Sequence, residues 1–164
     1  LSDGSKNITV MMRNAAIYIL AVFICLASGY MAGLLQATAL EEWYPTLAKS
    51  SLTPPNLMFP VAWGILYVCI GVSLGETIRC GNIRAIAPWV LQLIANFLWT
   101  VFFFWLRNPL LALIDILFLD VLVIWYIVAA SRGTRLSMWL FVPYLLWLLL
   151  ATYLNLYVCM HNTF

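Results

Sequence analysis

Residues 41–67 read EEWYPTLAKSSLTPPNLMFPVAWGILY, and this aromatic and proline-rich stretch decides the fold. It connects two long uncharged runs, residues 14–40 and 50–75, each of which is long enough to cross a bilayer. Trp and Tyr offer large flat apolar faces with a polar edge. We therefore expect residues 36–57 to form a lid over a pocket for something flat and apolar.

Composition places the whole chain in a membrane. Its 164 residues are 65% hydrophobic and 9% charged, with a mean hydropathy of +1.00, whereas soluble chains carry roughly 25% charged residues. Uncharged runs at 85–106 and 136–160 add two spans of about 20 residues or more. A fifth run, 109–130, holds Asp115 and Asp120 and must also be helical, because irregular backbone does not face lipid.

The sequence thus predicts an all-α membrane protein, a bundle of five transmembrane helices with a long aromatic and proline-rich loop between helices 1 and 2. We expect a polar N-terminal tail over 1–12, a single five-helix domain over 13–160 and a C-terminal tail over 161–164. The expected helices cover residues 13–35, 59–78, 86–106, 109–130 and 136–160. The first run is too long for the apolar core of a signal peptide, so we expect it to be retained.

The placement of Lys and Arg predicts the orientation in the membrane. With five spans, one side of the membrane carries most of the basic residues, which are Lys6, Arg13, Arg79, Arg84, Arg132 and Arg135. The other side carries Lys49 and Arg107. The positive-inside rule then places the N-terminus in the cytoplasm and the C-terminus on the opposite side. A net charge of +2 spread over loops provides no basic patch for nucleic acid.

Small and polar residues inside the spans admit two interpretations each. Gly29 and Gly33 form a GxxxG pair that suits either packing within the bundle or dimerisation. Polar atoms share one stripe of the third helix, at Gln92, Asn96, Trp99, Thr100 and Phe103, which indicates either interhelical hydrogen bonds or contact with a ligand. Asp115 and Asp120 lie about 140° apart around their helix and do not line one face. Each is either a helix–helix hydrogen-bonding group or a functional carboxyl.

The last helix places aromatic and small residues on one face. Tyr144, Trp147, Ala151, Leu154 and Asn155 recur at intervals of three and four residues. His161 lies past this run and is expected to be an interfacial residue rather than a ligand. The cysteines Cys25, Cys69, Cys80 and Cys159 lack CxxC spacing, so we expect neither a metal site nor redox chemistry.

Three sequence blocks resemble the TspO/MBR family, the tryptophan-rich sensory proteins and translocator proteins. The first is Trp43-Tyr44, Lys49, Pro54-Pro55, Phe59-Pro60-Val61-Ala62-Trp63 and Tyr67; the second is Asn96-Phe97-Leu98-Trp99 with Phe102-Phe103; the third is Pro143-Tyr144-Leu145-Leu146-Trp147 with Ala151-Thr152-Tyr153-Leu154-Asn155. Their order and spacing extend over nearly the whole chain.

The resemblance implies a five-helix membrane protein, commonly a homodimer, that binds tetrapyrroles such as protoporphyrin IX or haem. It also implies binding of cholesterol-like lipids and of synthetic benzodiazepine-type ligands. The residues that it places at the pocket are Trp43, Trp63, Asn96, Trp99, Tyr144, Trp147, Ala151 and Leu154. No cofactor is required, and protoporphyrin IX or haem would be the ligand. The function expected is porphyrin sensing, transport or control in a membrane.

Two departures from the family pattern affect these expectations. The family often has Lys-Pro where this chain has Lys49-Ser50, so we expect Ser50 to be a weak point of the loop. Tyr157 lacks a following basic residue, which puts sterol binding through the C-terminus in doubt and favours a bacterial membrane over the mitochondrial outer membrane.

Two other functions stay open at this point. One is light- and oxygen-dependent porphyrin breakdown, in which Trp63 and Trp147 would participate; no nucleophile or acid/base pair is visible, so the pigment, light and oxygen would supply the chemistry. The other is sterol or lipid transport.

Overall fold

A computed structural model describes residues 2–163, with side chains from residue 7 onward. Within that range all regular secondary structure is helical. The five long helices are α1 (Ser2–Glu42), α2 (Met58–Arg79), α3 (Ile86–Thr100), α4 (Pro109–Ser131) and α5 (Arg135–His161). Three short elements lie between them: η1 (Tyr44–Thr46), η2 (Ile83–Ala85) and η3 (Val101–Trp105), the last a π-helical turn. The prediction of five membrane-spanning helices is confirmed.

Helix α1 is longer at both ends than the predicted 13–35. Residues 2–12, predicted as a polar tail, are helical, and Leu1 lies outside the described range. Residues 36–42 are Gln-Ala-Thr-Ala-Leu-Glu-Glu, which are mostly good helix formers, so the polar change at Gln36 does not end the helix. The α-helix ends just before Pro45, because proline has no N–H to continue the i→i−4 bonds and its ring crowds the preceding turn; the chain passes into the short 3-10 helix η1. The segment between α1 and α2 is therefore residues 43–57, which we call the connector, and not 36–57.

The other helices begin and end close to the predicted residues, and local hydrogen bonds explain where. Asn108 caps α4, its Oδ1 accepting from the Leu111 N–H at 3.0 Å, and Pro109 occupies the first turn. Thr134 caps α5 in the same way, through the Ser137 N–H at 3.1 Å. His161, predicted to begin the C-terminal tail, still belongs to α5, and Phe164 of that tail lies outside the described residues.

Helix α3 ends irregularly. The Leu106 N–H donates to the Val101 carbonyl at 2.8 Å, five residues earlier, which widens the last turn into a π turn. This turn lets two consecutive side chains, Phe103 and Phe104, both be buried. Arg107 then adopts a left-handed backbone conformation with φ of 50°, which reverses the chain into α4.

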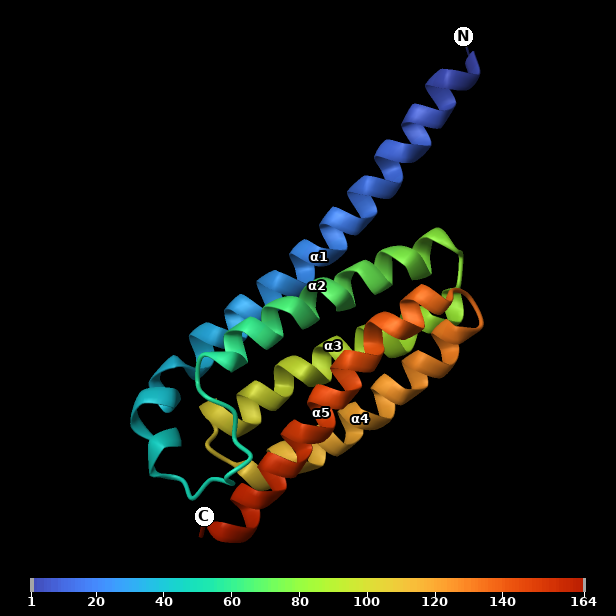
Figure 1. Cartoon of the computed structure of the whole chain (residues 1–164). Helices are drawn as coiled ribbons and strands as arrows, with labels where there is room; N and C mark the ends of the chain where they lie inside the picture. Colours follow the sequence, from blue (N-terminus) through green and yellow to red (C-terminus); the bar gives the residue numbers. More distant parts are fainter. Residues whose placement is uncertain (1, 164) are drawn as a thin grey trace.

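The helices pack as two tight pairs around α3. Helix α1 lies along α2, and α4 lies along α5, with α3 beside α4 (Figure 1). The N-terminal part of α1 extends past the other helices, and the two termini lie at opposite ends of the molecule (Figure 1). The 41 residues of α1 extend over about 60 Å, roughly twice the thickness of a bilayer core.

Glycines bring α1 and α2 into close contact. A Cβ atom at Gly71 would lie 2.5 Å from the backbone Cα of Val22, and one at Gly29 would collide with the ring of Tyr67. Gly33, by contrast, has open space where a Cβ would be. The Gly29 half of the GxxxG pair thus serves packing within the bundle, where the absence of a side chain lets the two helices approach.

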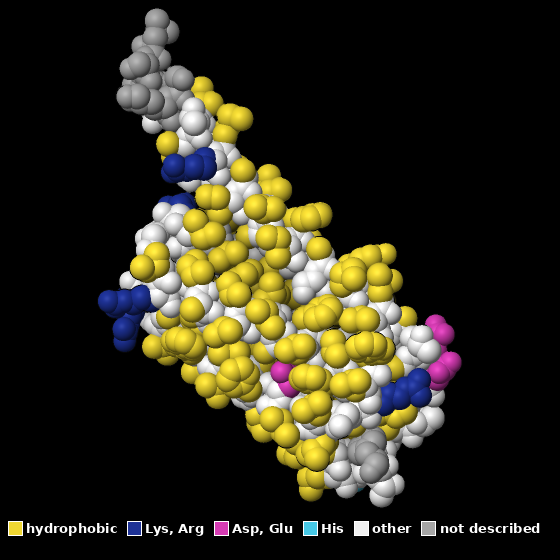
Figure 2. Space-filling model, turned by 180° about the vertical axis from the view of Figure 1, so that it is seen from behind, with side chains coloured by type: hydrophobic (Ala, Val, Ile, Leu, Met, Phe, Trp, Pro, Cys, Tyr) yellow, Lys and Arg dark blue, Asp and Glu magenta, His cyan; other side chains and the backbone are white. Residues whose placement is uncertain are grey.

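Buried hydroxyls join α2, α4 and α5 at the end of the bundle opposite the connector. Thr77 Oγ1 lies 2.8 Å from the Tyr126 hydroxyl, and Ser137 Oγ donates to the Ser73 carbonyl at 3.3 Å. The outer surface is in contrast largely apolar, as Figure 2 shows for one face, with basic side chains near the ends of the molecule. This distribution is the one that lipid requires of a multi-pass membrane protein.

Candidate functional site

The connector is fastened to the C-terminal end of α5. The Ala48 N–H donates to Asn162 Oδ1 at 2.9 Å, and Asn162 Nδ2 donates to the Ala48 carbonyl at 3.1 Å. Ser50, predicted to be a weak point, is buried, and its hydroxyl lies 3.1 Å from the Tyr153 hydroxyl. Ser50 is therefore an attachment point of the connector. A proline at this position would make the backbone more rigid, whereas serine provides a hydrogen bond to α5.

Lys49 folds the first part of the connector onto itself. Its ammonium donates to the carbonyls of Tyr44 at 2.8 Å and Leu47 at 3.1 Å, and lies 4.8 Å from the centre of the Tyr44 ring. That ring packs against Phe104 at 5.8 Å, and its burial raises the pKa of Tyr44. These contacts keep Lys49 occupied within the connector rather than directed at the bundle.

One group of aromatic rings lies between α2 and α5. The Trp63 ring stacks on Tyr67 at 5.4 Å and meets Tyr144 at 6.2 Å and Trp147 at 6.4 Å edge to face. Phe59 then meets Trp147 at 5.9 Å. Edge-to-face and offset stacking are the favoured arrangements for such rings. Trp63 is thus the centre of a continuous aromatic wall.

A second group forms around the π turn of α3. Trp99 stacks on Phe103 at 5.1 Å, and Trp43 meets the same Phe103 ring at 5.6 Å. Trp43 thus packs on this second aromatic group, with Phe103 among its contacts.

Hydrogen bonds lock the polar groups of the site between the helices. The Tyr67 hydroxyl donates to Asn96 Oδ1 at 2.8 Å, and Asn96 Nδ2 donates to the Tyr144 hydroxyl at 3.0 Å. Trp99 Nε1 donates to Asn155 Oδ1 at 3.0 Å, and Asn155 Nδ2 donates to the Pro109 carbonyl at 2.8 Å. These bonds join α2, α3, α4 and α5, so the amides of Asn96 and Asn155 fix the spacing of the walls.

A small cavity of about 10 Å³ lies where the two aromatic groups meet. Its lining residues come from α2, α3, α4 and α5 and are Trp63, Asn96, Trp99, Ile116, Leu119, Leu148 and Ala151. This volume is about the least that holds one water molecule, whereas drug-sized ligands occupy roughly 300–1,000 Å³. In this conformation the site is closed, and a large ligand requires side chains or the connector to move.

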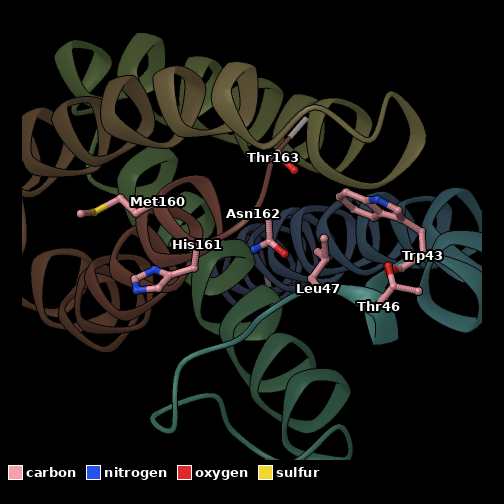
Figure 3. A pocket seen from close by; sticks show the side chains of 7 residues that line it. All are labelled: Trp43, Thr46, Leu47, Met160, His161, Asn162 and Thr163. Carbon is pink, nitrogen blue, oxygen red and sulfur yellow. The ribbon is translucent and has the colours of Figure 1, made fainter.

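A larger hollow of about 530 Å³ opens on the outside, between the connector and the end of α5. Figure 3 shows Trp43 and Leu47 on one side of it and Asn162 on the other, with the His161 ring turned away from Trp43. That ring stacks on Tyr157 at 3.9 Å, and its Nδ1 lies 2.9 Å from the Tyr157 carbonyl. His161 is thus held against Tyr157 on its own helix.

The structure brings together six of the eight residues predicted at the pocket. Trp63, Asn96, Trp99 and Ala151 line the cavity, and Tyr144 and Trp147 contact its lining residues. Trp43 lies on the outer hollow, and Leu154 is half-buried outside the set that lines the cavity.

Sequence reasoning missed Leu148 on α5 and also Ile116 and Leu119, both on α4. This helix is apolar on all sides, so nothing in its sequence distinguishes the positions that face the cavity.

Three polar side chains of the membrane interior, Gln92, Asp115 and Asp120, lack full pairing among the described residues, and for Asp115 the unpaired atom is Oδ2. Asp120 Oδ2 accepts from Thr152 Oγ1 at 2.9 Å, a helix–helix bond that was one of its two open interpretations, but its Oδ1 is unpaired among the described residues. Gln92 is fully buried, and neither its Oε1 nor its Nε2 has a hydrogen-bond partner within residues 2–163. Burying an unpaired amide costs about 2–7 kcal/mol. The stripe on α3 therefore divides into a paired residue, Asn96, and an unpaired one, Gln92.

Comparison with known proteins gives consistent results. A sequence model described as the TspO/MBR family matches residues 21–161. The chain is 37% identical over 145 residues to a tryptophan-rich protein TspO of Archaeoglobus fulgidus, covering 87% of this chain and 94% of the relative. It is 37% identical to a tryptophan-rich sensory protein of Cereibacter sphaeroides, covering 70% and 73%. It is 32% identical to the human translocator protein, covering 74% and 75%.

Proposed function

Because this chain belongs to the TspO/MBR family, we propose that it binds a tetrapyrrole such as protoporphyrin IX or haem between α2, α3, α4 and α5, beneath the connector. The observation that carries the proposal is that Trp63 and Trp99 line one cavity, with Trp147 packed against Trp63. A macrocycle presents a wide π face, and tryptophan rings supply stacking area in a mostly apolar site.

The polar groups at the cavity would orient the bound ligand. Asn96 is held by two tyrosines, so its position is set before a ligand arrives. Preorganised polar groups of this kind favour one pose of a bound ligand. The wall at Ala151 is small and leaves room for a bulky partner.

The connector is the element that would open for the ligand. Asn162 and Ser50 provide the hydrogen bonds that fasten it to α5. Each such bond contributes about 0.5–1.5 kcal/mol, so breaking them is possible at ordinary temperature. The connector between α1 and α2 thus has the role of the lid expected from its aromatic and proline content.

The proposal extends to the setting of the protein. The loop arginines Arg79, Arg84, Arg132 and Arg135 lie at the end of the bundle from which the α1 N-terminus projects, which supports a cytoplasmic N-terminus. We place the protein in a bacterial membrane as a homodimer, and its physiological role in sensing, transport or control of porphyrin.

A second candidate is photo-oxidative porphyrin breakdown. The Trp63 and Trp147 rings lie 6.4 Å apart, so a pigment held at this wall would touch both. The bound pigment, light and oxygen would supply the chemistry, and the protein would supply the position.

One experiment separates these outcomes. Purified protein is titrated with protoporphyrin IX in the dark, and affinity is read from quenching of tryptophan fluorescence. The same complex is then illuminated, and pigment loss is compared with pigment flux through proteoliposomes. Saturable binding in the dark supports the proposal, and binding no stronger than to empty detergent micelles would refute it. Light-dependent pigment loss that disappears in a Trp63→Phe, Trp147→Phe double variant would support the breakdown reaction.

A further inference from the structure

Among the described residues, Gln92 is the fully buried side chain whose two polar atoms both lack a hydrogen-bond partner. It is 0% exposed, and both ends of its amide are unpaired within the described part of the chain. The polar stripe on α3 was interpreted as either interhelical hydrogen bonding or ligand contact. Asn96 makes interhelical hydrogen bonds, and Gln92 makes none. An unpaired amide in a membrane protein is costly, so its pairing is expected in another state of the molecule.

Gln92 lies close to the cavity. It is four residues before Asn96, which puts the two side chains on one face of α3, one turn and about 6 Å apart. Asn96 lines the cavity, and Gln92 lies one turn farther from the connector. A ligand that enlarges the cavity along α3, away from the connector, therefore meets Gln92 next.

The neighbouring polar groups on this face are already engaged. Trp89 Nε1 donates to the Ile70 carbonyl at 3.0 Å, and Asn96 is bonded to Tyr67 and Tyr144. Re-pairing Gln92 with the single N–H of Trp89 would break an existing buried bond, and Asn96, although its amide could form further bonds, makes none to Gln92 in this conformation. A group brought by the ligand would pair with Gln92 without that loss.

We propose that Gln92 binds a carboxylic acid group of the planar ligand that occupies the cavity and thereby selects for ligands that carry one. This inference rests on the proposed tetrapyrrole-binding function. A primary amide offers one acceptor and two donors, and an un-ionised carboxylic acid offers the complementary donor and acceptor. In the low dielectric of the bundle interior the acid is favoured over its anion, and the pair forms two hydrogen bonds at once.

The test combines one substitution with three porphyrins. Protoporphyrin IX carries two free acids, its dimethyl ester keeps only acceptors, and octaethylporphyrin has neither. All three share the same porphyrin ring, so differences in their affinities reflect the groups attached at the edge of that ring. Affinities are measured in the dark for the wild type and for Gln92→Leu, which keeps a similar volume without the amide. Thermal unfolding of the ligand-free proteins is measured in parallel.

We expect Gln92→Leu to raise the unfolding temperature, because it removes an unpaired buried amide. We expect it to weaken protoporphyrin IX binding about 3- to 30-fold, as for the loss of one or two hydrogen bonds, to weaken the ester less and to leave octaethylporphyrin unchanged. The matched control is Thr77→Val, which removes a buried hydrogen bond to Tyr126 far from the cavity. It should lower the unfolding temperature and leave all three affinities unchanged.

Three results would overturn the inference. A lower unfolding temperature for Gln92→Leu would mean that the amide is paired within the protein, and an equal loss of affinity for all three porphyrins would mean that it acts only on cavity shape. Unchanged affinity of Gln92→Leu for protoporphyrin IX would mean that Gln92 does not contact the ligand. If the wild type binds none of the three porphyrins, the proposed function itself fails. This result is distinct from a failure of the Gln92 inference, because it is seen with the wild type alone.

Discussion

The side-chain amide of Asn162 pairs with both backbone polar atoms of Ala48, 114 positions away in the sequence. Asn162 Nδ2 also donates to the Val158 carbonyl at 2.9 Å, which fixes the amide to the last turn of α5. A single side chain thus fastens the connector to the C-terminal end of the bundle. If the connector is the lid of a binding site, this contact between Asn162 and Ala48 slows the opening of the lid.

We expect Asn162→Leu to speed dissociation of protoporphyrin IX about 5- to 150-fold, since two hydrogen bonds to Ala48 of about 0.5–1.5 kcal/mol each are lost. Stopped-flow recovery of tryptophan fluorescence measures this rate, and hydrogen exchange at Ala48 should quicken with it. Asn56→Leu, a substitution at an exposed position of the same connector, is the control and should leave both rates unchanged. Equal dissociation from the two variants would show that the Ala48 contact does not restrain the ligand.

A second prediction concerns Ser50, for which the structure reverses the expectation from sequence. A proline at this position would match the family pattern, but it would remove the hydroxyl that contacts Tyr153 and accepts from the Leu52 N–H at 3.2 Å. We expect Ser50→Pro to speed ligand release, and Ser50→Ala and Tyr153→Phe to speed it by similar amounts. Slower release from the proline variant alone would mean that backbone rigidity outweighs the bond to α5.

The contact between α1 and α2 provides a third prediction, on stability. Gly71→Ala places a Cβ against the backbone of Val22, which has no flexible end to move aside, so the helices must separate. We expect a loss of about 1–3 kcal/mol, as for overpacked interiors. Gly33→Ala is the control: its Cβ meets open space, so the change should be neutral or stabilising by up to about 1 kcal/mol. Thermal or denaturant unfolding in one detergent compares the two, and equal stabilities would contradict the close packing.

The fourth prediction places Trp147 against the ligand. Trp147→Ala should weaken protoporphyrin IX binding by about 1–3 kcal/mol, by analogy with the loss of one stacked aromatic ring. Trp139→Ala on the same helix removes a ring that is 61% exposed on the outer surface and should leave affinity unchanged. Fluorescence titration of both variants, each checked for folding by circular dichroism, decides the matter. Equal losses would indicate a general effect on α5 rather than a contact.

Much of the fold could be predicted because the lipid-facing surface imposes a simple pattern. Runs free of charge are long in four of the five helices, α4 with Asp115 and Asp120 being the exception, and charges such as Arg79 and Arg107 mark helix ends. The end of α1 could not be read in this way. Composition changes at Gln36, but backbone conformation is governed by Pro45, nine residues later. The π turn was also beyond prediction, because Val-Phe-Phe-Phe-Trp reads as any apolar helix would.

The site was predictable where motifs carry side chains of unusual chemistry. Asn96 and Trp99 stand out in an apolar helix, and both line the cavity. Ile116 does not stand out from the other aliphatic residues of α4, although it lines the same cavity. The attachment of Ala48 to Asn162 depends on two distant segments meeting in space, which no local pattern records.

The π turn at the end of α3 has a consequence for how chain length can vary. In a regular helix each added residue rotates everything beyond it by about 100°, which would turn one flank of a membrane helix from protein toward lipid. A π turn accommodates one additional residue locally, so the flanks stay in phase. Residues 101–105 are therefore where we expect homologous chains to gain or lose single residues, while Asn96 and Trp99 on one side and the Arg107 reversal on the other keep their orientation.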